Sequence, residues 1–421
     1  MAIHVGIDFG TTNSAIAVAK DGLAPELLRF PTPQGTNAST WRSVLYFESS
    51  ENNKPNVTGG AMAIGRYLES GGDGRFIQST KSHLASRLFN KTNILNKNYA
   101  LEDLIGMYLL KMRNAIELDL GHTAVVGRPV RYWGATDKDD DKRAIERMTK
   151  GLNKAGFTEI VYENEPTAAA SKYADRLNEE KLVFIADYGG GTSDFCLLKI
   201  GGDGATQEIL ATGGYGIGGD TFDGALVDHL VAPCLGKGSH YGDGFGKLTE
   251  IPHVLYTKLR RWHHLAFLKT RENMALLERI LNGAVEEKMI EDFLHVIEND
   301  LGLPLHRSIE GIKQHLTSNQ SGNFHFLDHP IDISAGVTQD EFSSWVSPDL
   351  DKLDAVINEM LQKAGVPSET VDQVFATGGS SLVPAVKNRL KRRFPGRLEG
   401  GDELTSVALG LAKRARVEFE K

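Results

Sequence analysis

Two stretches of the chain repeat one pattern, and this pattern decides the fold. Residues 182–200 read LVFIADYGGGTSDFCLLKI, and residues 3–18 read IHVGIDFGTTNSAIAV. Each stretch is an apolar strand, an Asp-x-Gly sequence, a turn rich in Gly and Thr, and a second apolar strand. The two aspartates, Asp8 and Asp187, are separated by the length of a domain. The pattern therefore indicates a duplicated domain rather than an array of short repeats.

The sequence around these hairpins alternates strands and helices, which is typical of an α/β fold. Residues 250–320 carry apolar side chains three and four apart and predict a nearly continuous helical block. Thr338 and Glu341 form a capping box that predicts a short helix. Further strands are predicted at 41–47, 123–127, 158–162 and 373–377, and further helices at 61–69, 101–118, 138–155, 166–178, 351–363, from about 384, and at 403–416.

Composition excludes several classes of protein. The length of 421 residues predicts two or three domains, and 41% hydrophobic and 24% charged residues are ordinary for a globular chain. A net charge of −8 disfavours nucleic acid as a partner, because phosphate binding requires clustered cations. Only two cysteines occur, Cys196 and Cys234, without metal-binding spacing, which fits a reducing cytoplasm. No signal peptide or long apolar segment occurs, so we expect a cytoplasmic protein that does not span a membrane.

Gly-rich turns point to a phosphate ligand. Turns at 10–14, 189–192 and 378–381 follow apolar strands, and a fourth lies at 213–219. Backbone N–H groups in such turns can surround a phosphate, and Thr or Ser hydroxyls add donors. Two facing Asp-x-Gly turns could bind a triphosphate from both sides, while Asp8 and Asp187 hold a hydrated Mg²⁺.

Other chemistries find less support. The fourth turn also matches G-x-G-x-x-G at Gly214, Gly216 and Gly219, which is found in dinucleotide-binding folds. The acidic residue expected about 20 positions later has no strand end to occupy, because a loop is predicted there. No H-E-x-x-H or G-x-S-x-G sequence occurs, so neither a zinc protease site nor a serine nucleophile is indicated.

Five motifs, in order along residues 6–410, resemble the nucleotide-binding domain of the 70-kDa heat-shock protein family. They are 6–14 (GIDFGTTNS), 164–170 (NEPTAAA), 187–194 (DYGGGTSD), 218–223 (GGDTFD) and 377–381 (TGGSS). The resemblance implies a duplicated actin-like (ribonuclease H-like) ATPase fold, α/β in class, with two lobes around a nucleotide cleft. It also implies ATP or ADP and Mg²⁺ as cofactors, with K⁺ as a further cation.

The resemblance assigns roles to matching positions. Catalytic roles fall to Asp8, Lys81, Glu165, Asp187 and Thr192, with Lys81 orienting the attacking water. Metal binding through water falls to Asp8, Asp187 and Asp194. Nucleotide-binding roles fall to Gly10, Thr11, Thr12, Asn13, Gly189, Gly190, Gly191, Thr192, Gly218, Gly219, Glu310, Lys313, Gln314, Gly378, Gly379, Ser380, Leu382 and Asp402.

Two features depart from the family pattern. Gln314 and Leu382 stand where the family places two arginines that stack on the adenine, so we expect weaker or less base-selective binding. The interval from Asp223 to Glu310 is long, and its extra residues fall in the helical block. This block could be a docking element for a partner, a lid, or a packing element only.

The domain prediction is lobe I at 1–181, lobe II at 182–400 with an enlarged helical subdomain at about 224–320, and a C-terminal helix at 401–421 packing on lobe I. No peptide-binding domain is expected in this sequence. The predicted function is slow ATP hydrolysis by a chaperone-like monomer that acts with a client protein or co-chaperone. An actin-like filament protein, a small-molecule kinase and a nucleotide-binding scaffold with little turnover are the alternatives.

Overall fold

The computed structural model describes residues 2–50, 54–70, 74–174, 179–201, 207–242, 246–399 and 405–420. Its contacts divide the chain into two compact units. The first comprises Met1–Gly219, Asp351–Leu382 and Asn388–Lys421, and the second comprises Asp220–Leu350 and Val383–Lys387. The predicted lobe boundaries, at 181/182 and 400/401, stay a prediction.

The first unit contains two sheets with the same strand order. One sheet runs β13-β12-β1-β2-β3, and the other runs β16-β15-β14-β21-β22. In each, the Asp-x-Gly hairpin is antiparallel and its first strand pairs in parallel with a later strand. This equivalence confirms the predicted duplication. The strands are β1 Ile3–Asp8, β2 Asn13–Lys20, β3 Glu26–Leu27, β12 Thr123–Arg128, β13 Glu159–Asn164, β14 Lys181–Tyr188, β15 Ser193–Ile200, β16 Gln207–Tyr215, β21 Gln373–Thr377 and β22 Leu398–Glu399.

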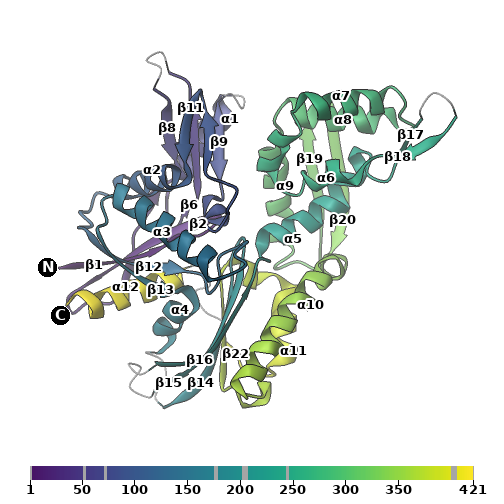
Figure 1. Cartoon of the computed structure of the whole chain (residues 1–421). Coiled ribbons are helices and arrows are strands. Elements are labelled where there is room, and N and C mark those ends of the chain that lie inside the picture. The colour runs from purple at the N-terminus through teal and green to yellow at the C-terminus, as the bar shows by residue number, and fades with distance from the viewer. Residues whose placement is uncertain are drawn as a thin grey trace. The chain divides into compact units, whose positions relative to one another are not determined.

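The two faces of β2 explain how the last helix joins the first sheet. Ile16 and Val18 belong to the large core shared with α2 Leu101–Asn114 and α3 Lys138–Lys154. The alternate positions are alanines at 15, 17 and 19, which pack on Ala408 and Ala412 of α12 Ser406–Phe419. Small side chains let the helix approach the sheet closely. The close approach strengthens the dispersion contacts between them, because such contacts weaken steeply with distance. Figure 1 shows α12, in yellow, next to α4 Glu165–Ala174 and β1.

The remaining elements of the first unit surround this sheet. The strand expected at 41–47 is divided at Ser43 into two short strands. The elements are β4 Phe30–Pro31, β5 Asn37–Ala38, β6 Trp41–Arg42, β7 Val44–Glu48, β8 Asn56–Gly59, α1 Gly60–Glu69, β9 Arg75–Gln78, the 3₁₀ turn η1 Thr80–His83, β10 Lys91–Ile94 and β11 Lys97–Ala100. After β21 come the 3₁₀ turn η6 Gly379–Leu382 and the helix α11 Pro384–Arg393, which includes residues of both units.

The second unit holds the predicted helical block and a hairpin. The block is divided by turns rather than nearly continuous, because short loops reverse the chain between its helices. The elements are α5 Gly219–Leu226, the turns η2 Val227–Val231 and η3 Ala232–Leu235, β17 His240–Gly242, β18 Leu248–Glu250, α6 His253–Thr257, η4 Trp262–Phe267, α7 Arg271–Leu281, α8 Glu287–Glu298, α9 Gly302–His315, β19 Ser321–Asp328 and β20 Ile331–Thr338. Figure 1 shows α7 and α8 side by side.

Residues 339–364 differ from the prediction. A short helix near 338 and a separate helix at 351–363 were expected, but α10 Gln339–Ala364 is one helix with Pro348 inside it. Phe342, Val346, Leu350 and Leu353 are buried at spacings of three and four through the proline. This packing stabilises the helix where proline removes one backbone hydrogen bond.

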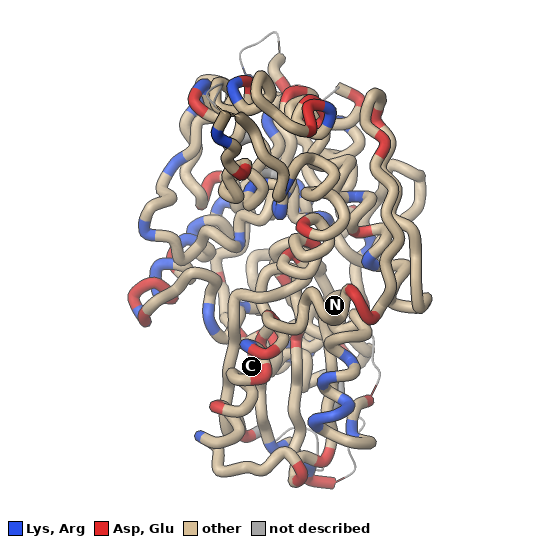
Figure 2. Tube along the Cα trace, turned by 90° about the vertical axis from the view of Figure 1, so that its right-hand side faces the viewer, with Lys and Arg blue, Asp and Glu red and all other residues tan. Residues whose placement is uncertain are grey.

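Acidic and basic residues are interspersed along the trace (Figure 2). Within the described ranges, no helix combines the length and the apolar character needed to cross a bilayer.

Candidate functional site

Four Gly-rich loops of the first unit meet at Gly189. Its N–H donates to the carbonyl of Thr192 at 2.9 Å, which closes the turn between β14 and β15. The carbonyl of Gly189 accepts from the Gly219 N–H at 3.0 Å and from the Ser380 hydroxyl at 3.0 Å. The loop at 10–12 lies beside the same turn, since a Cβ on Gly191 would come 3.0 Å from Thr11 Oγ1.

Two of these loops require glycine. A Cβ on Gly10 would lie 1.9 Å from the carbonyl oxygen of Asn13, inside the tight turn between β1 and β2. Gly378 has φ +80°, and a Cβ there would lie 2.2 Å from the carbonyl of Tyr188. The loop after β21 therefore packs its backbone directly against the Asp187 turn, with no room for a side chain at Gly378. Such packed, fixed backbone can present N–H groups to a phosphate.

Carboxylates gather around one lysine next to these loops. Lys81, in η1, donates from Nζ to Glu165 Oε1 at 2.5 Å, and both side chains are buried. Glu165 is the first residue of α4, so the helix start fixes it beside the sheet. Asp8 and Asp187 end or nearly end the equivalent strands β1 and β14, and both keep part of their surface exposed. A ligand can therefore reach these two carboxylates.

The pKa values of the aspartates reflect crowding of negative charge. Desolvation by the surrounding protein, and then the charge of Glu165, raise the pKa of Asp8 to about 7. The same two causes, in that order, raise the pKa of Asp187 well above its usual range. Burial acts to lower the pKa of Lys81, but the charges of Glu165 and Asp8 outweigh it and the pKa is raised. One ammonium does not neutralise these acids, so they would bind a further cation favourably.

Asp194 extends this group from β15. Its side chain is 1% exposed, and Oδ1 accepts from the backbone N–H of Val130 at 3.0 Å. Burial, and then the charge of Glu165, raise the pKa of Asp194 to about 7, against a hydrogen bond from Thr192. The N–H of Val130 is a contact that sequence patterns did not indicate.

A hydroxyl network behind the first loop was also not predicted. Ser43 donates to the carbonyl of Gly10 at 2.7 Å, and its oxygen lies 3.0 Å from the hydroxyl of Ser14. Ser14 Oγ in turn accepts from the Gly10 N–H at 3.2 Å, and Tyr108 donates to Ser43 at 3.4 Å. Tyr108 lies on α2, and a single sequence gives no signal that pairs it with Ser43.

The second unit contains a separate ion pair on α9. Lys313 Nζ lies 2.6 Å and 2.8 Å from the two carboxylate oxygens of Asp223, and both side chains are largely buried. Burial acts to lower the pKa of Lys313, but Asp223 outweighs it and the pKa is raised. Glu310 contributes to this field one turn earlier on the helix. Gln314, beside Lys313, is exposed.

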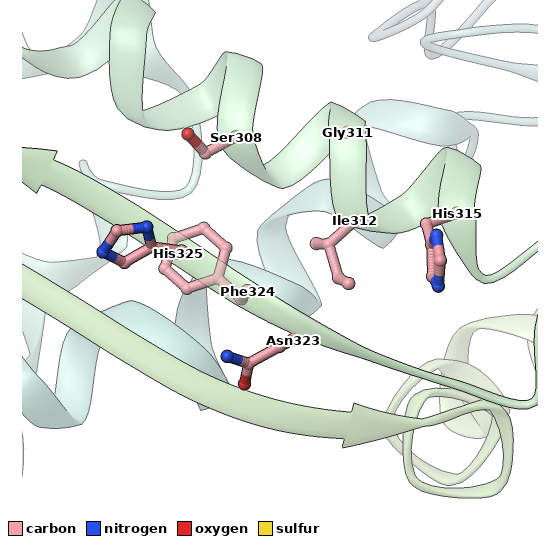
Figure 3. A pocket seen from close by; sticks show the side chains of 7 residues that line it. All are labelled: Ser308, Gly311, Ile312, His315, Asn323, Phe324 and His325. Carbon is pink, nitrogen blue, oxygen red and sulfur yellow. The ribbon is translucent and has the colours of Figure 1, made fainter.

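The opposite face of α9 lines an open pocket of about 260 Å³. Ser308, Ile312 and His315 of the helix face Phe324 and His325 of β19 across it (Figure 3). None of the predicted nucleotide-binding residues lines this pocket, because they lie on the other side of the helix.

The model of the Hsp70 protein family matches residues 4–237 and 284–418, most of the chain. The chain belongs to the Hsp70 family. Its fold is therefore the duplicated actin-like ATPase fold, as the two equivalent sheets indicate. The Chaperone protein DnaK of Thermosipho melanesiensis is 27% identical over 421 residues, which cover 98% of this chain and 59% of that protein. The chain thus spans a little over half the length of this Hsp70 relative.

The Hsp70 match omits residues 238–283. This segment holds β17, β18, α6, η4 and α7, so the unmatched part falls in the helical block that sequence spacing marked as unusually long. Its role as a docking element, a lid or a packing element stays open.

The structure brings together most predicted residues of the first unit. Close approaches or hydrogen bonds join the loops of Thr11, Gly189, Gly191, Thr192, Gly218, Gly219, Gly378 and Ser380, while Gly10 lies in the turn that holds Thr11. Thr12, Asn13, Gly190 and Gly379 belong to the same loops, and Leu382, which is 36% exposed, ends η6. Glu310, Lys313 and Gln314 belong to the second unit. Asp402 lies outside the described residues.

Proposed function

We propose that this chain binds ATP with Mg²⁺ and hydrolyses it slowly, as a chaperone-like Hsp70 protein. One observation carries the proposal: a single lysine and four carboxylates are set beside four interlocked Gly-rich loops. Phosphoryl transfer needs N–H donors, cations and a positioned nucleophile more than a strong base. This arrangement offers N–H donors and a lysine in one unit of the protein, and it leaves room for the proposal that Lys81 positions a water.

The residues present fit a hydrated Mg²⁺. Asp8 and Asp187 are accessible, have raised pKa values and exceed the available positive charge, so a divalent cation would relieve their repulsion. Bound Mg²⁺ would neutralise phosphate charge at this place. In the proposal Asp194 holds a water or K⁺, and the loops at 10–13 and 189–192 donate to phosphate oxygens.

Lys81 and Glu165 would control the attacking water. A buried ammonium held at 2.5 Å by a carboxylate has a fixed position, and a water bound to it would have a fixed line of approach. Thr192, whose side chain bonds Asp194, would place its hydroxyl near the same water. These residues act as positioning groups, which suits a slow hydrolysis.

Partners and location belong to the same proposal. A client protein or co-chaperone would bind with an affinity that depends on the bound nucleotide. The name of the relative, a chaperone protein, supports this proposal. We place the protein in the reducing cytoplasm as a monomer. Two free thiols support this location, and burial raises the pKa of Cys196 to about 12, so that thiol is inert.

Steady-state ATP hydrolysis with Mg²⁺ tests the function. Asp187→Asn is expected to lower turnover by at least about a hundredfold, the usual loss when one electrostatic group of a site is removed. Lys363→Ala is the matched control, because it removes an exposed lysine that pairs with Glu359. Wild-type turnover no higher than that of Asp187→Asn would refute the hydrolysis.

A second candidate is a nucleotide-binding scaffold with little turnover. Gln314 and Leu382, in place of the arginines of the family pattern, favour it because a loosely held base positions the phosphates less well. Calorimetric ATP binding without measurable hydrolysis would support the scaffold against the ATPase.

A further inference from the structure

Three potential metal ligands from the two ends of the chain meet on the first unit. His4 lies on β1, Asp21 follows β2 in the next turn, and Glu420 follows the last residue of α12. His4 Nε2 is 3.5 Å from Asp21 Oδ1 and 3.9 Å from Glu420 Oε1. One ligand atom from each residue lies within 4.8 Å of the others.

The imidazole of His4 is buried without a partner. Its side chain is 4% exposed, yet Nε2 has no hydrogen-bond partner among the residues that the structure describes. A buried polar nitrogen normally has one, because leaving it unpaired costs free energy. The two carboxylate distances exceed the length of a hydrogen bond, so neither acid satisfies Nε2 directly. The atom points at the two carboxylates and lacks a partner between them.

The framework around these side chains is fixed. His4 pairs with Ala19 across the hairpin, and the Leu23 N–H donates to the Lys20 carbonyl at 3.0 Å, which closes the turn that holds Asp21. Arg416 of α12 donates to the carbonyl of Leu23 at 2.9 Å. The end of the helix is thus bound to the same turn, which keeps the backbones of Asp21 and Glu420 close to each other.

The chemistry of the three groups selects the ion. One imidazole nitrogen and two carboxylate oxygens suit a divalent transition metal such as Zn²⁺, more than Mg²⁺ or Ca²⁺, which prefer oxygen. Bonds of about 2.0–2.2 Å to a tetrahedral ion place ligand atoms roughly 3.4 Å apart. The two carboxylates are about half exposed, so they can move closer to each other from a separation that is within 4.8 Å. A cation is also favoured at the carboxyl end of α12 by the helix dipole.

We propose that His4, Asp21 and Glu420 bind one Zn²⁺-like ion that joins the first strand to the last helix. Water completes the coordination. The ion partners His4 Nε2 and neutralises two acids at a helix end. This site is separate from the residues assigned to nucleotide, and its role is structural.

Zinc titration of the nucleotide-free, metal-free whole chain tests the site. Wild type is compared by calorimetry with the double variant Asp21→Asn/Glu420→Gln, which changes only half-exposed side chains and should fold normally. Asp332→Asn is the matched control, since it removes the carboxylate of an exposed pair with His325. We expect the double variant to bind one Zn²⁺ fewer per chain, and Asp332→Asn to keep that ion.

Two further readouts separate a bound metal from a simple ion pair. Saturating Zn²⁺ should raise the melting temperature of wild type by about 3–6 °C and that of the double variant by much less. Co²⁺ should give visible d–d absorption in wild type that His4→Phe removes. Equal zinc stoichiometry and equal thermal shifts in wild type and the double variant would overturn the proposal and leave the three side chains as an ion-pair cluster.

Discussion

Two groups of acids among the described residues each surround a lysine, and the groups differ in charge balance. The Lys81 cluster, in the first unit, consists of Lys81 with Asp8, Glu165, Asp187 and Asp194. The Lys313 cluster, in the second unit, consists of Lys313 and Arg261 with Asp220, Asp223 and Glu310. Four carboxylates face one cation in the first cluster, whereas three face two in the second.

The imbalance shows which cluster is suited to an added cation. In the Lys313 cluster the ammonium lies within 2.8 Å of both oxygens of Asp223, although burial still raises the pKa of Asp223 and raises that of Asp220 to about 6. In the Lys81 cluster the lysine bonds Glu165, and three aspartates remain with raised pKa values. Four acids against one cation leave more uncompensated negative charge than three against two, and acids perturbed in this way mark the Lys81 cluster as the candidate ligand site.

Removing Lys81 should have the largest effect on stability. Lys81→Met leaves Glu165 buried without its partner, and we expect a loss of about 3–5 kcal/mol in the free energy of unfolding at pH 8. The loss should be smaller at pH 6, because the neighbouring acids can then take up a proton. Urea denaturation followed by circular dichroism measures both values.

Lys363→Met provides the control for this comparison. Lys363 pairs with Glu359 on the surface, and exposed pairs contribute only about 0–1 kcal/mol. A Lys81→Met loss as small as that of Lys363→Met would show that the Lys81 cluster is not held by its ion pair.

Removing Lys313 should cost less, about 2–3 kcal/mol. Lys313→Met also leaves a buried acid, Asp223, but His306 still acts on Asp223 and Arg261 still acts on the neighbouring Asp220. Trp262 and Trp345 belong to the second unit, and replacing Trp41 and Trp133 of the first unit by Phe leaves them as reporters of the second unit. The fluorescence of Trp262 and Trp345 should change at a lower urea concentration in Lys313→Met than in the chain that keeps Lys313. A larger loss than that of Lys81→Met would reverse the ranking of the clusters.

Neutralising one aspartate of the Lys81 cluster should stabilise the nucleotide-free protein. Desolvation and then Glu165 raise the pKa of Asp8, so the folded chain retains a proton that the unfolded chain releases above about pH 4. The contribution of Asp8 to stability therefore falls as the pH rises from about 4 to 7. Asp8→Asn should raise the free energy of unfolding by about 1–2 kcal/mol at pH 8, and by less at pH 4.

Asp141→Asn is the control for Asp8→Asn, because Asp141 lies outside the cluster and bonds the backbone of Tyr132. A destabilised Asp8→Asn at pH 8 would mean that the Asp8 charge is already compensated in the folded protein.

The sequence predicted the parts of the fold that depend on local pattern. Both Asp-x-Gly hairpins were found, because apolar strands around Gly-rich turns leave a mark in any one stretch of chain. The hairpin β19–β20 was missed although Phe324, Phe326, Ile331 and Ile333 are buried at alternate positions, since the adjoining helical block dominated the interpretation. The capping box at Thr338 and the helix expected at 351–363 belong to one helix, because tertiary packing continues it through Pro348.

The residues of the candidate site also fall into those that sequence motifs indicate and those that they do not. Residues carried by motifs, such as Asp8, Gly189 and Thr192, could be named in advance. The bonds from Ser43 to Gly10 and from Val130 to Asp194 could not, because each joins segments far apart in sequence through one hydrogen bond. The cluster of His4, Asp21 and Glu420 is even harder to predict from sequence. These residues come from opposite ends of the chain and match no spacing rule.

The smallest expected effect concerns the base of the nucleotide. Gln314 is exposed on α9 one residue after Lys313. Its side chain is therefore free to contact a ligand without disturbing the buried ion pair of the Lys313 cluster. Gln314→Arg would add a guanidinium able to stack on an aromatic base, a contact of about 0.5–1 kcal/mol at an exposed position. We expect ATP affinity to rise about two- to fivefold, with no change in stability.

Calorimetric titration with ATP and GTP measures this effect, and Gln362→Arg on α10 controls for added charge. Wild type should bind the two nucleotides with similar affinity, since neither Gln314 nor Leu382 offers a guanidinium to the base. Sub-micromolar, adenine-only binding by wild type would contradict this expectation. It would also show that contacts other than a stacked guanidinium select the base.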